Sequence, residues 1–261
     1  MTTLLSLARG CGQLFSANRH IFESMLLLAT DTSGKNGSIA LARLTSGQSE
    51  VGVLEVVPLA GGAFSAQLVP QIAALLEKHG YRKTDLAAFA VASGPGSFTG
   101  LRVGLAAIKA LAEALQKPIA AISLLEAVAW TSTVPSAARG RILAALDAGR
   151  GDVYVGDYEL QPRMHMHSER LVSREEFLAE AKGAEAKGEA TRNTVATPDA
   201  RLAETFRAAG IRAELIEYPN AGVIAHLGWE RLRRGQTVRP EELEANYIRH
   251  SDAEIFSKPV L

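Results

Sequence analysis

Two stretches of the chain, "LLLATDTSGKNGSIAL" (residues 26–41) and "RILAALDAGRGDVYVG" (residues 141–156), follow the same plan and decide the fold. Each is an apolar run that ends at an aspartate, Asp31 in the first and Asp147 in the second, and each continues through glycines into another strand-like run. An uninterrupted apolar run is typical of a buried strand, and the glycines after it indicate a turn. The repeat therefore predicts a duplicated lobe that opens with a β-hairpin.

Strand and helix patterns alternate after each hairpin. Before the second hairpin we expect strands over residues 25–31, 37–44, 51–57, 86–92 and 118–122, and helices over 65–79, 100–116 and 123–130. From the second hairpin onward we expect strands over 141–147 and 152–158, and a helix from the capping box of Ser173 and Glu176 to Ala181. Residues 194–196, 202–209 and 213–216 continue the α/β alternation, and a last helix is expected over 221–234. This order predicts an α/β fold of two duplicated lobes, of the actin, sugar-kinase and heat-shock ATPase type.

The composition indicates a globular protein and argues against a nucleic-acid or membrane partner for the chain by itself. Of the 261 residues, 47% are hydrophobic and 21% are charged, and 28 basic residues balance 28 acidic ones. A balanced charge gives no overall field that would attract an anionic polymer or a lipid surface. Cys11 is the single cysteine, so an internal disulfide and a thiolate metal site are excluded and the cytoplasm is the expected compartment.

The first residues differ from the rest. "MTTLLSLARGCGQLFSANRHIFES" (residues 1–24) has no basic start or cleavage pattern of a signal peptide, and Arg9 interrupts its apolar run. We expect residues 1–24 to be an extension outside the fold, with a short surface helix as an equal alternative. Residues 25–131 are then the first lobe and residues 132–261 the second, with the last helix packing back on the first lobe.

A glycine-rich corner, "SGPGSFTGLRVG" (residues 93–104), joins an apolar strand to a helix. Gly100 is followed by Leu101 and Arg102, whereas a P-loop needs lysine and a hydroxyl residue there. The glycine spacing is one residue too long for a dinucleotide-binding pattern, and Pro95 takes the place of the first glycine of a nucleophile elbow. A structural or interface corner is the favoured interpretation, with anion binding by free helix amides as the open alternative.

The helix after this corner is apolar on two sides. One stripe consists of Leu101, Leu105, Ile108, Ala112 and Leu115, and a neighbouring stripe of mostly small residues consists of Gly104, Ala107, Leu111 and Ala114. A helix with two apolar sides needs two neighbours. One neighbour is the chain's own sheet, and the other is either the helix over residues 65–79 or a helix of another chain.

The hairpin "DTSGKNGS" (residues 31–38) is a candidate phosphate site. Asp31, Thr32 and Ser33 supply oxygens, and Gly37 allows the backbone to approach a ligand closely. The alternative, equally supported by the residues, is a turn in which these oxygens bond the hairpin's own amides.

The sequence offers no metal or catalytic constellation. No two histidines are four residues apart, which is the spacing that two ligands on one helical turn would need. His165 and His167 would point to the same side of a strand, and we expect them to face solvent.

Five blocks occur in the order typical of one known family: "LLLATDTS", "FSAQLVPQI", "ASGPGSFTGLRVGLAAIKALA", "LDAGRGDVYVG" and "NYIR". From about residue 25 to its end the chain resembles the TsaB (YeaZ) family, a subunit of the bacterial machinery that makes threonylcarbamoyladenosine in tRNA. The block "GPGSFTGLRVG" is shared with the paralogue TsaD, whose H-x-E-G-H metal histidines have no equivalent in "FSAQLVPQ". Phe64 stands where many TsaB sequences keep a histidine, and Gly149 replaces an arginine of the family pattern.

The resemblance implies a non-catalytic scaffold that binds TsaD and supports threonylcarbamoyl transfer to tRNA adenosine, with no catalytic residues of its own. The implied partner interface comprises Leu68, Ile72, Leu75, Ser97, Phe98, Thr99, Arg102, Gly104, Ala107 and Leu111. A vestigial nucleotide site would comprise Asp31, Thr32, Ser33, Gly37 and Asp147. No cofactor is expected to bind tightly, and weak binding of ATP or ADP with magnesium is left open.

The resemblance also implies a TsaE-type ATPase docked on the TsaB–TsaD pair, tRNA bound through the complex, no membrane partner, and a homodimer of this chain when TsaD is absent. The alternative function is an enzyme of the same fold, either an ATP-using phosphotransferase or a metallopeptidase.

Overall fold

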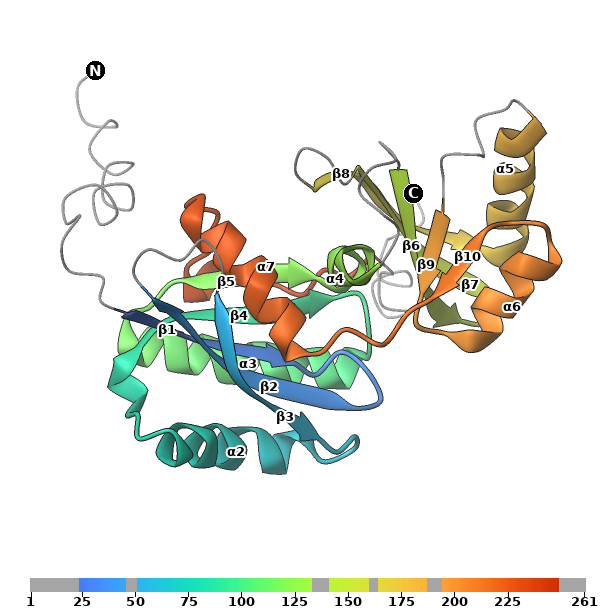
Figure 1. Ribbon diagram of the computed structural model, residues 1–261. Helices are drawn as coiled ribbons and strands as arrows, with labels where there is room; N and C mark the ends of the chain where they lie inside the picture. Colours follow the sequence, from blue (N-terminus) through green and yellow to red (C-terminus); the bar gives the residue numbers. More distant parts are fainter. Residues whose placement is uncertain (1–23, 46–50, 133–140, 160–163, 187–193, 249–261) are drawn as a thin grey trace, which may run out of the picture. The chain divides into compact units, whose positions relative to one another are not determined.

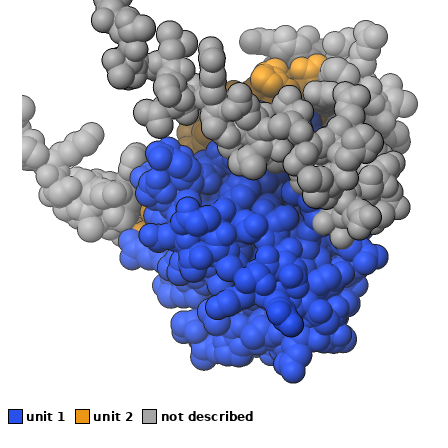
Figure 2. Space-filling view, turned by 90° about the vertical axis from the view of Figure 1, so that its left-hand side faces the viewer, with its two compact units in different colours: residues 1–92, 99–122, 220–244 blue, residues 93–98, 123–219, 245–261 orange. Residues whose placement is uncertain are grey.

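The computed structural model describes residues 24–45, 51–132, 141–159, 164–186 and 194–248. The chain divides into two compact units, coloured separately in Figure 2. Unit 1 comprises residues up to Ala92 together with 99–122 and 220–244, and unit 2 comprises 93–98, 123–219 and the residues from Ala245 onward.

Unit 1 is built on a mixed five-stranded sheet in the order β3-β2-β1-β4-β5. Strand β1 (Ser24–Asp31) pairs antiparallel with β2 (Gly37–Thr45) and parallel with β4 (Leu86–Gly94). The outer strands are β3 (Gly52–Leu59) and β5 (Ile119–Ser123). In β1 the residues from Leu26 to Asp31 are buried, as expected of a strand covered on both faces.

Unit 2 repeats this sheet. Its strands are β6 (Arg141–Gly149), β7 (Asp152–Glu159), β8 (His165–Ser173), β9 (Thr194–Thr197) and β10 (Ala213–Leu215). The order β10-β9-β6-β7-β8, read from the other end, is the order of the first sheet. Strand β6 is antiparallel to β7 and parallel to β9, as β1 is to β2 and β4. The predicted fold class of two duplicated α/β lobes is confirmed.

The helices follow the same repeat. Helix α2 (Phe64–Lys78) and helix α3 (Phe98–Leu115) connect strands of the first sheet, as α5 (Arg174–Ala186) and α6 (Ala200–Ala208) do in the second. Each set ends in one more helix, α4 (Leu124–Thr131) or α7 (Ala221–Arg233). Short 3-10 helices occupy Lys83–Asp85 and Pro240–Glu242. Figure 1 shows α2 and α3 on one side of the first sheet and α7 on the other.

The expected lobe boundary after residue 131 is wrong. Helix α4 packs on β6 and β7, so it belongs to unit 2, and the boundary lies between Ile122 and Ser123. Helix α7 comes late in the chain but packs on β1 and β2 of unit 1. A Cβ on Gly228 of α7 would lie 2.4 Å from the Cβ of Ala90, so only glycine permits this approach. The expected extension over residues 1–24 lies outside the described residues apart from Ser24, which begins β1.

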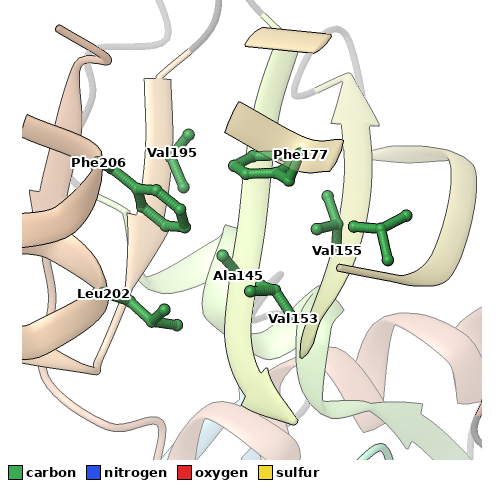
Figure 3. Packing of buried hydrophobic residues seen from close by; sticks show 8 residues of the cluster. Ala145, Val153, Val155, Phe177, Val195, Leu202 and Phe206 are labelled. Carbon is green, nitrogen blue, oxygen red and sulfur yellow. The ribbon is translucent and has the colours of Figure 1, made fainter. Parts of the chain in front are cut away.

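The core of unit 2 lies where its two connecting helices cover the sheet. The rings of Phe177 on α5 and Phe206 on α6 meet with centroids 5.2 Å apart, over Ala145 of β6 and Val195 of β9 (Figure 3). These side chains are almost fully buried, and each buried aromatic side chain stabilises the fold by about 1.5–3 kcal/mol.

Candidate functional site

The first hairpin turns its polar groups inward. Asp31 at the end of β1 is 1% exposed, and its Oδ1 accepts hydrogen bonds from the backbone amide of Ser33 (2.8 Å) and from the Ser33 hydroxyl (2.5 Å). The Thr32 hydroxyl donates to the carbonyl oxygen of Gly100 at 2.7 Å, in the first turn of α3. The hydroxyls of Thr32 and Ser33 therefore serve the fold of unit 1 in this structure.

The aromatic ring of Phe64 closes the far side of the hairpin. A Cβ at Gly37 would lie 2.6 Å from the carbonyl oxygen of Asp31 and 2.8 Å from Cε1 of Phe64. Gly37 is therefore required for contact with the protein's own backbone and a phenyl ring. A hydrocarbon ring has no group that could coordinate a metal ion or neutralise a phosphate, and Phe64 is the first residue of α2.

Burial changes the acidity of Asp31. Removal from water raises the pKa of this carboxyl group from 3.8 to about 6, against the opposing effect of its two hydrogen bonds with Ser33. A carboxylate that held a magnesium ion would need the ionised form, and with a pKa of about 6 this carboxyl group reaches that form at a higher pH than a free aspartate does.

Asp147, the equivalent residue in the second hairpin, has different surroundings. Its side chain is 45% exposed and forms an ion pair with Arg174 at 3.7 Å. Its Oδ1 accepts a hydrogen bond from the backbone amide of Gly149 at 3.2 Å. The tip of this hairpin, from Gly149 through Arg150 to Gly151, has positive φ at each residue. The two aspartates thus occupy equivalent strand positions, one buried in unit 1 and the other exposed in unit 2.

Three residues of the predicted interface are interior. Leu68, Ile72 and Leu75 of α2 are 1%, 4% and 2% exposed, and they pack toward the sheet of unit 1. The prediction that they contact a partner is corrected. They form the apolar stripe of an amphipathic helix, and this stripe is buried in the core of unit 1.

Gly104 is also interior. A Cβ there would lie 2.3 Å from the Thr32 hydroxyl oxygen, so this glycine serves contact between α3 and the first hairpin rather than a partner helix. The other predicted interface residues on the corner and α3 are accessible. Ser97, Phe98, Thr99 and Arg102 are exposed, and Ala107 and Leu111 are half-buried.

Alanine at Gly104 is expected to destabilise the chain by about 2 kcal/mol, since overpacking and loss of the Thr32–Gly100 hydrogen bond outweigh the better helix propensity of alanine. Urea unfolding checks this, with Thr32→Ala and the double variant completing the cycle. The Gly104→Ala change should cost clearly less in the Thr32→Ala background, because the obstructing hydroxyl is gone. Equal costs in both backgrounds would contradict the assigned contact.

Most of the residues that α2 and α3 expose were not predicted from the sequence as outward faces. On α3, Ala106, Ala110 and Ala114 are exposed at intervals of four residues and form a stripe we call the alanine stripe. On α2, the exposed residues before its last turn are uncharged, and we call them the α2 outer face: Ser65, Ala66, Val69, Pro70, Gln71, Ala73 and Ala74. The sequence does carry a signal for these faces. If the larger apolar side chains of each helix are assigned to the core, the small and polar residues between them are left facing outward.

Among the residues that the structure describes, no three His, Cys, Asp or Glu side chains form a group that could hold a metal ion. The rings of His165 and His167 lie 5.1 Å apart on β8, and both residues are exposed, as predicted. Nε2 of His167 lies 3.5 Å from a carboxylate oxygen of Glu159.

Comparisons with known proteins show the family of this chain. The family model described as "TsaD: tRNA N6-adenosine threonylcarbamoyltransferase" matches residues 55–255. The Escherichia coli protein named tRNA threonylcarbamoyladenosine biosynthesis protein TsaB is 28% identical over 233 residues, which cover 88% of this chain and 96% of that protein. The chain belongs to the TsaB (YeaZ) branch of the TsaD family.

Other TsaB relatives match in part. The Bacillus subtilis TsaB is 36% identical over 135 residues, which cover 52% of this chain and 56% of that protein. The chain thus spans little more than half the length of this relative. Among solved structures, YeaZ from Pseudomonas aeruginosa superposes with a TM-score of 0.65 at 25% identity, covering 85% of this chain and 99% of YeaZ. None of the described helices is both long enough and apolar enough to cross a membrane.

Proposed function

We propose that this TsaB-family chain is a non-catalytic subunit that binds a TsaD-type protein and thereby supports threonylcarbamoyl transfer to adenosine in tRNA. The reaction itself would take place on the TsaD-type partner. The single observation that carries the proposal is the first hairpin, where Asp31, Thr32 and Ser33 bond the chain itself and Phe64 fills the neighbouring space. Family membership and the name of the Escherichia coli relative support the pathway.

The chemistry of the hairpin supports a structural rather than a phosphate-binding role. A phosphate site needs free amides or cations directed at the ligand. Here the Ser33 amide donates to Asp31 and is not free for a ligand. Above its pKa of about 6 the buried Asp31 carboxylate is negatively charged, so it would repel an anion. We accordingly propose that the chain holds no nucleotide tightly.

The outer faces of α2 and α3 suit a partner helix. The α2 outer face has no charge and includes Val69, which is 55% exposed. The alanine stripe of α3 would let another helix approach closely, because the distance between packed helices depends on the side chains at the contact. Depletion of charge is typical of the centre of a protein interface. We propose that these faces, with the exposed corner residue Phe98, contact the TsaD-type partner.

The wider assembly follows from the same proposal. A TsaE-type ATPase would dock on the pair, tRNA would bind through the complex, and the same outer faces would form a homodimer when the partner is absent. The cytoplasm is the compartment in which tRNA modification of this kind would occur.

Co-purification tests the proposal. The full chain and a TsaD-type protein of the same bacterium should elute together in gel filtration at a mass of one copy of each, and the chain alone should elute at a mass that depends on its concentration. Separate elution at micromolar concentrations would contradict the proposal. The alternative enzyme would instead show hydrolysis of ATP or peptide by the chain alone.

A further inference from the structure

In unit 2, the carboxylate of Glu169 accepts hydrogen bonds from three separate segments of the chain. Glu169 lies on β8, and its Oε1 accepts hydrogen bonds from the hydroxyls of Ser123, before α4, and Tyr158, on β7. Its Oε2 accepts a hydrogen bond from Nδ2 of Asn246 at 2.7 Å. An ionised carboxylate can accept several such bonds, and bonds to a charged acceptor are stronger than neutral ones.

The segment that carries Asn246 also touches the glycine-rich corner. The backbone amide of Asn246 donates to the carbonyl oxygen of Ser93 at 2.7 Å. The ring of Tyr247 packs on the ring of Phe98 with centroids 5.2 Å apart and planes tilted by 35°. The corner from Ser93 to Phe98 and the segment from Ala245 to Ile248 are thus held together at both of the corner's ends, and all of these residues belong to unit 2.

The contact with Tyr247 restricts the orientation of the Phe98 side chain. Its side chain is 41% exposed although it is large and apolar, and the Tyr247 ring covers one side of it. An exposed aromatic side chain makes an effective interface anchor only when its orientation is fixed before binding, since ordering it otherwise costs affinity. The Gly94 φ of 121° is a backbone conformation that glycine adopts readily and other residues avoid, which explains the glycine at this corner.

We propose that residues 245–248 are a strap that holds the corner, so that Glu169, Asn246 and Tyr247 act as positioning residues for partner contact by Phe98. The "NYIR" and "SGPGSF" blocks then form one unit of structure although about 150 residues separate them. The inference rests on the proposed function for the identity of the partner, and on the contacts above for the strap itself.

Hydrogen exchange tests the strap without a partner. In the full chain, Asn246→Ala should increase deuterium uptake in peptides covering residues 93–104 and 245–248, and Tyr247→Leu should do the same, while other peptides exchange as in the wild type. Tyr218→Leu, at another partly exposed tyrosine of unit 2, is the matched control. Unchanged uptake over residues 93–104 in both strap variants would overturn the proposal, and thermal unfolding would confirm that each variant is folded.

Partner affinity tests what the strap does. With the TsaD-type protein as the titrant in calorimetry, Asn246→Ala and Tyr247→Leu should each weaken binding by about 5- to 30-fold, whereas Tyr247→Phe, which keeps the ring, should bind more tightly than Tyr247→Leu. Increased exchange with unchanged affinity would overturn the positioning role. Failure of the wild-type chain to bind would contradict the proposed function, while the exchange data would still decide whether the strap exists.

Discussion

Arginine in place of Ala106 or Ala110 is expected to weaken binding of the TsaD-type partner by about 100-fold or more, equivalent to about 2.7 kcal/mol. Both alanines lie on the alanine stripe of α3, where only a methyl group separates the helix from a neighbour. A long charged side chain would keep the partner helix apart and would have to be desolvated in the interface. Because both positions face solvent in the free chain, the variants should fold normally.

Calorimetric titration of each variant with the partner measures this effect. Ala208→Arg is the matched control, because Ala208 is an exposed alanine on α6, the helix of unit 2 that corresponds to α3. The control should bind the partner like the wild-type chain. Wild-type affinity in the Ala106→Arg and Ala110→Arg variants would remove α3 from the proposed interface.

Replacing Asp31 with asparagine is expected to change the free energy of unfolding more favourably at pH 8 than at pH 4, by a difference of about 2.4 kcal/mol. The folded pKa of about 6 lies above the unfolded value of 3.8, so the folded chain binds a proton more tightly than the unfolded chain. The free energy of unfolding therefore falls as the pH rises from about 4 to about 6, and the loss persists above pH 6. An amide does not titrate, so the variant escapes this loss.

Urea unfolding of the wild-type chain and the variant at several pH values between 4 and 8 gives this difference directly. Asp147→Asn, in the exposed second hairpin, controls for removal of one formal charge. If the stability of the variant relative to the wild type did not change between pH 4 and pH 8, the pKa of Asp31 would not be raised on folding, and this account of the first hairpin would be contradicted.

The architecture could be predicted from the sequence because its signals are local. The apolar runs that end at Asp31 and Asp147 identified the two central strands, and the repeat of their surroundings identified the duplication. The lobe boundary could not be predicted in this way. Helix α4 follows the strands of the first sheet but packs on the second, and its apolar pattern does not specify which sheet it covers.

The candidate site was harder to predict because its residues lie close together only in three dimensions. The sequence marked Asp31, Thr32 and Ser33 as oxygen donors, but it could not show that Thr32 bonds Gly100 in α3 or that Phe64 covers Gly37. For the same reason Gly104 was assigned to a partner contact, although its neighbour is a hydroxyl from the first hairpin. A small residue in a helix indicates a close approach but does not identify what approaches.

The formation of threonylcarbamoyladenosine in a tRNA transcript, given threonylcarbamoyl-adenylate and magnesium, tests the central claim most directly. With the TsaE-type ATPase present in every reaction, the assay would be run with the purified chain alone, with the TsaD-type protein alone, with both, and with the partner plus the Ala106→Arg variant. We expect no product from the chain alone, product from the pair in the presence of the TsaE-type ATPase, and strongly reduced product with the variant. Sustained metal-dependent product formation by the chain alone would contradict the account.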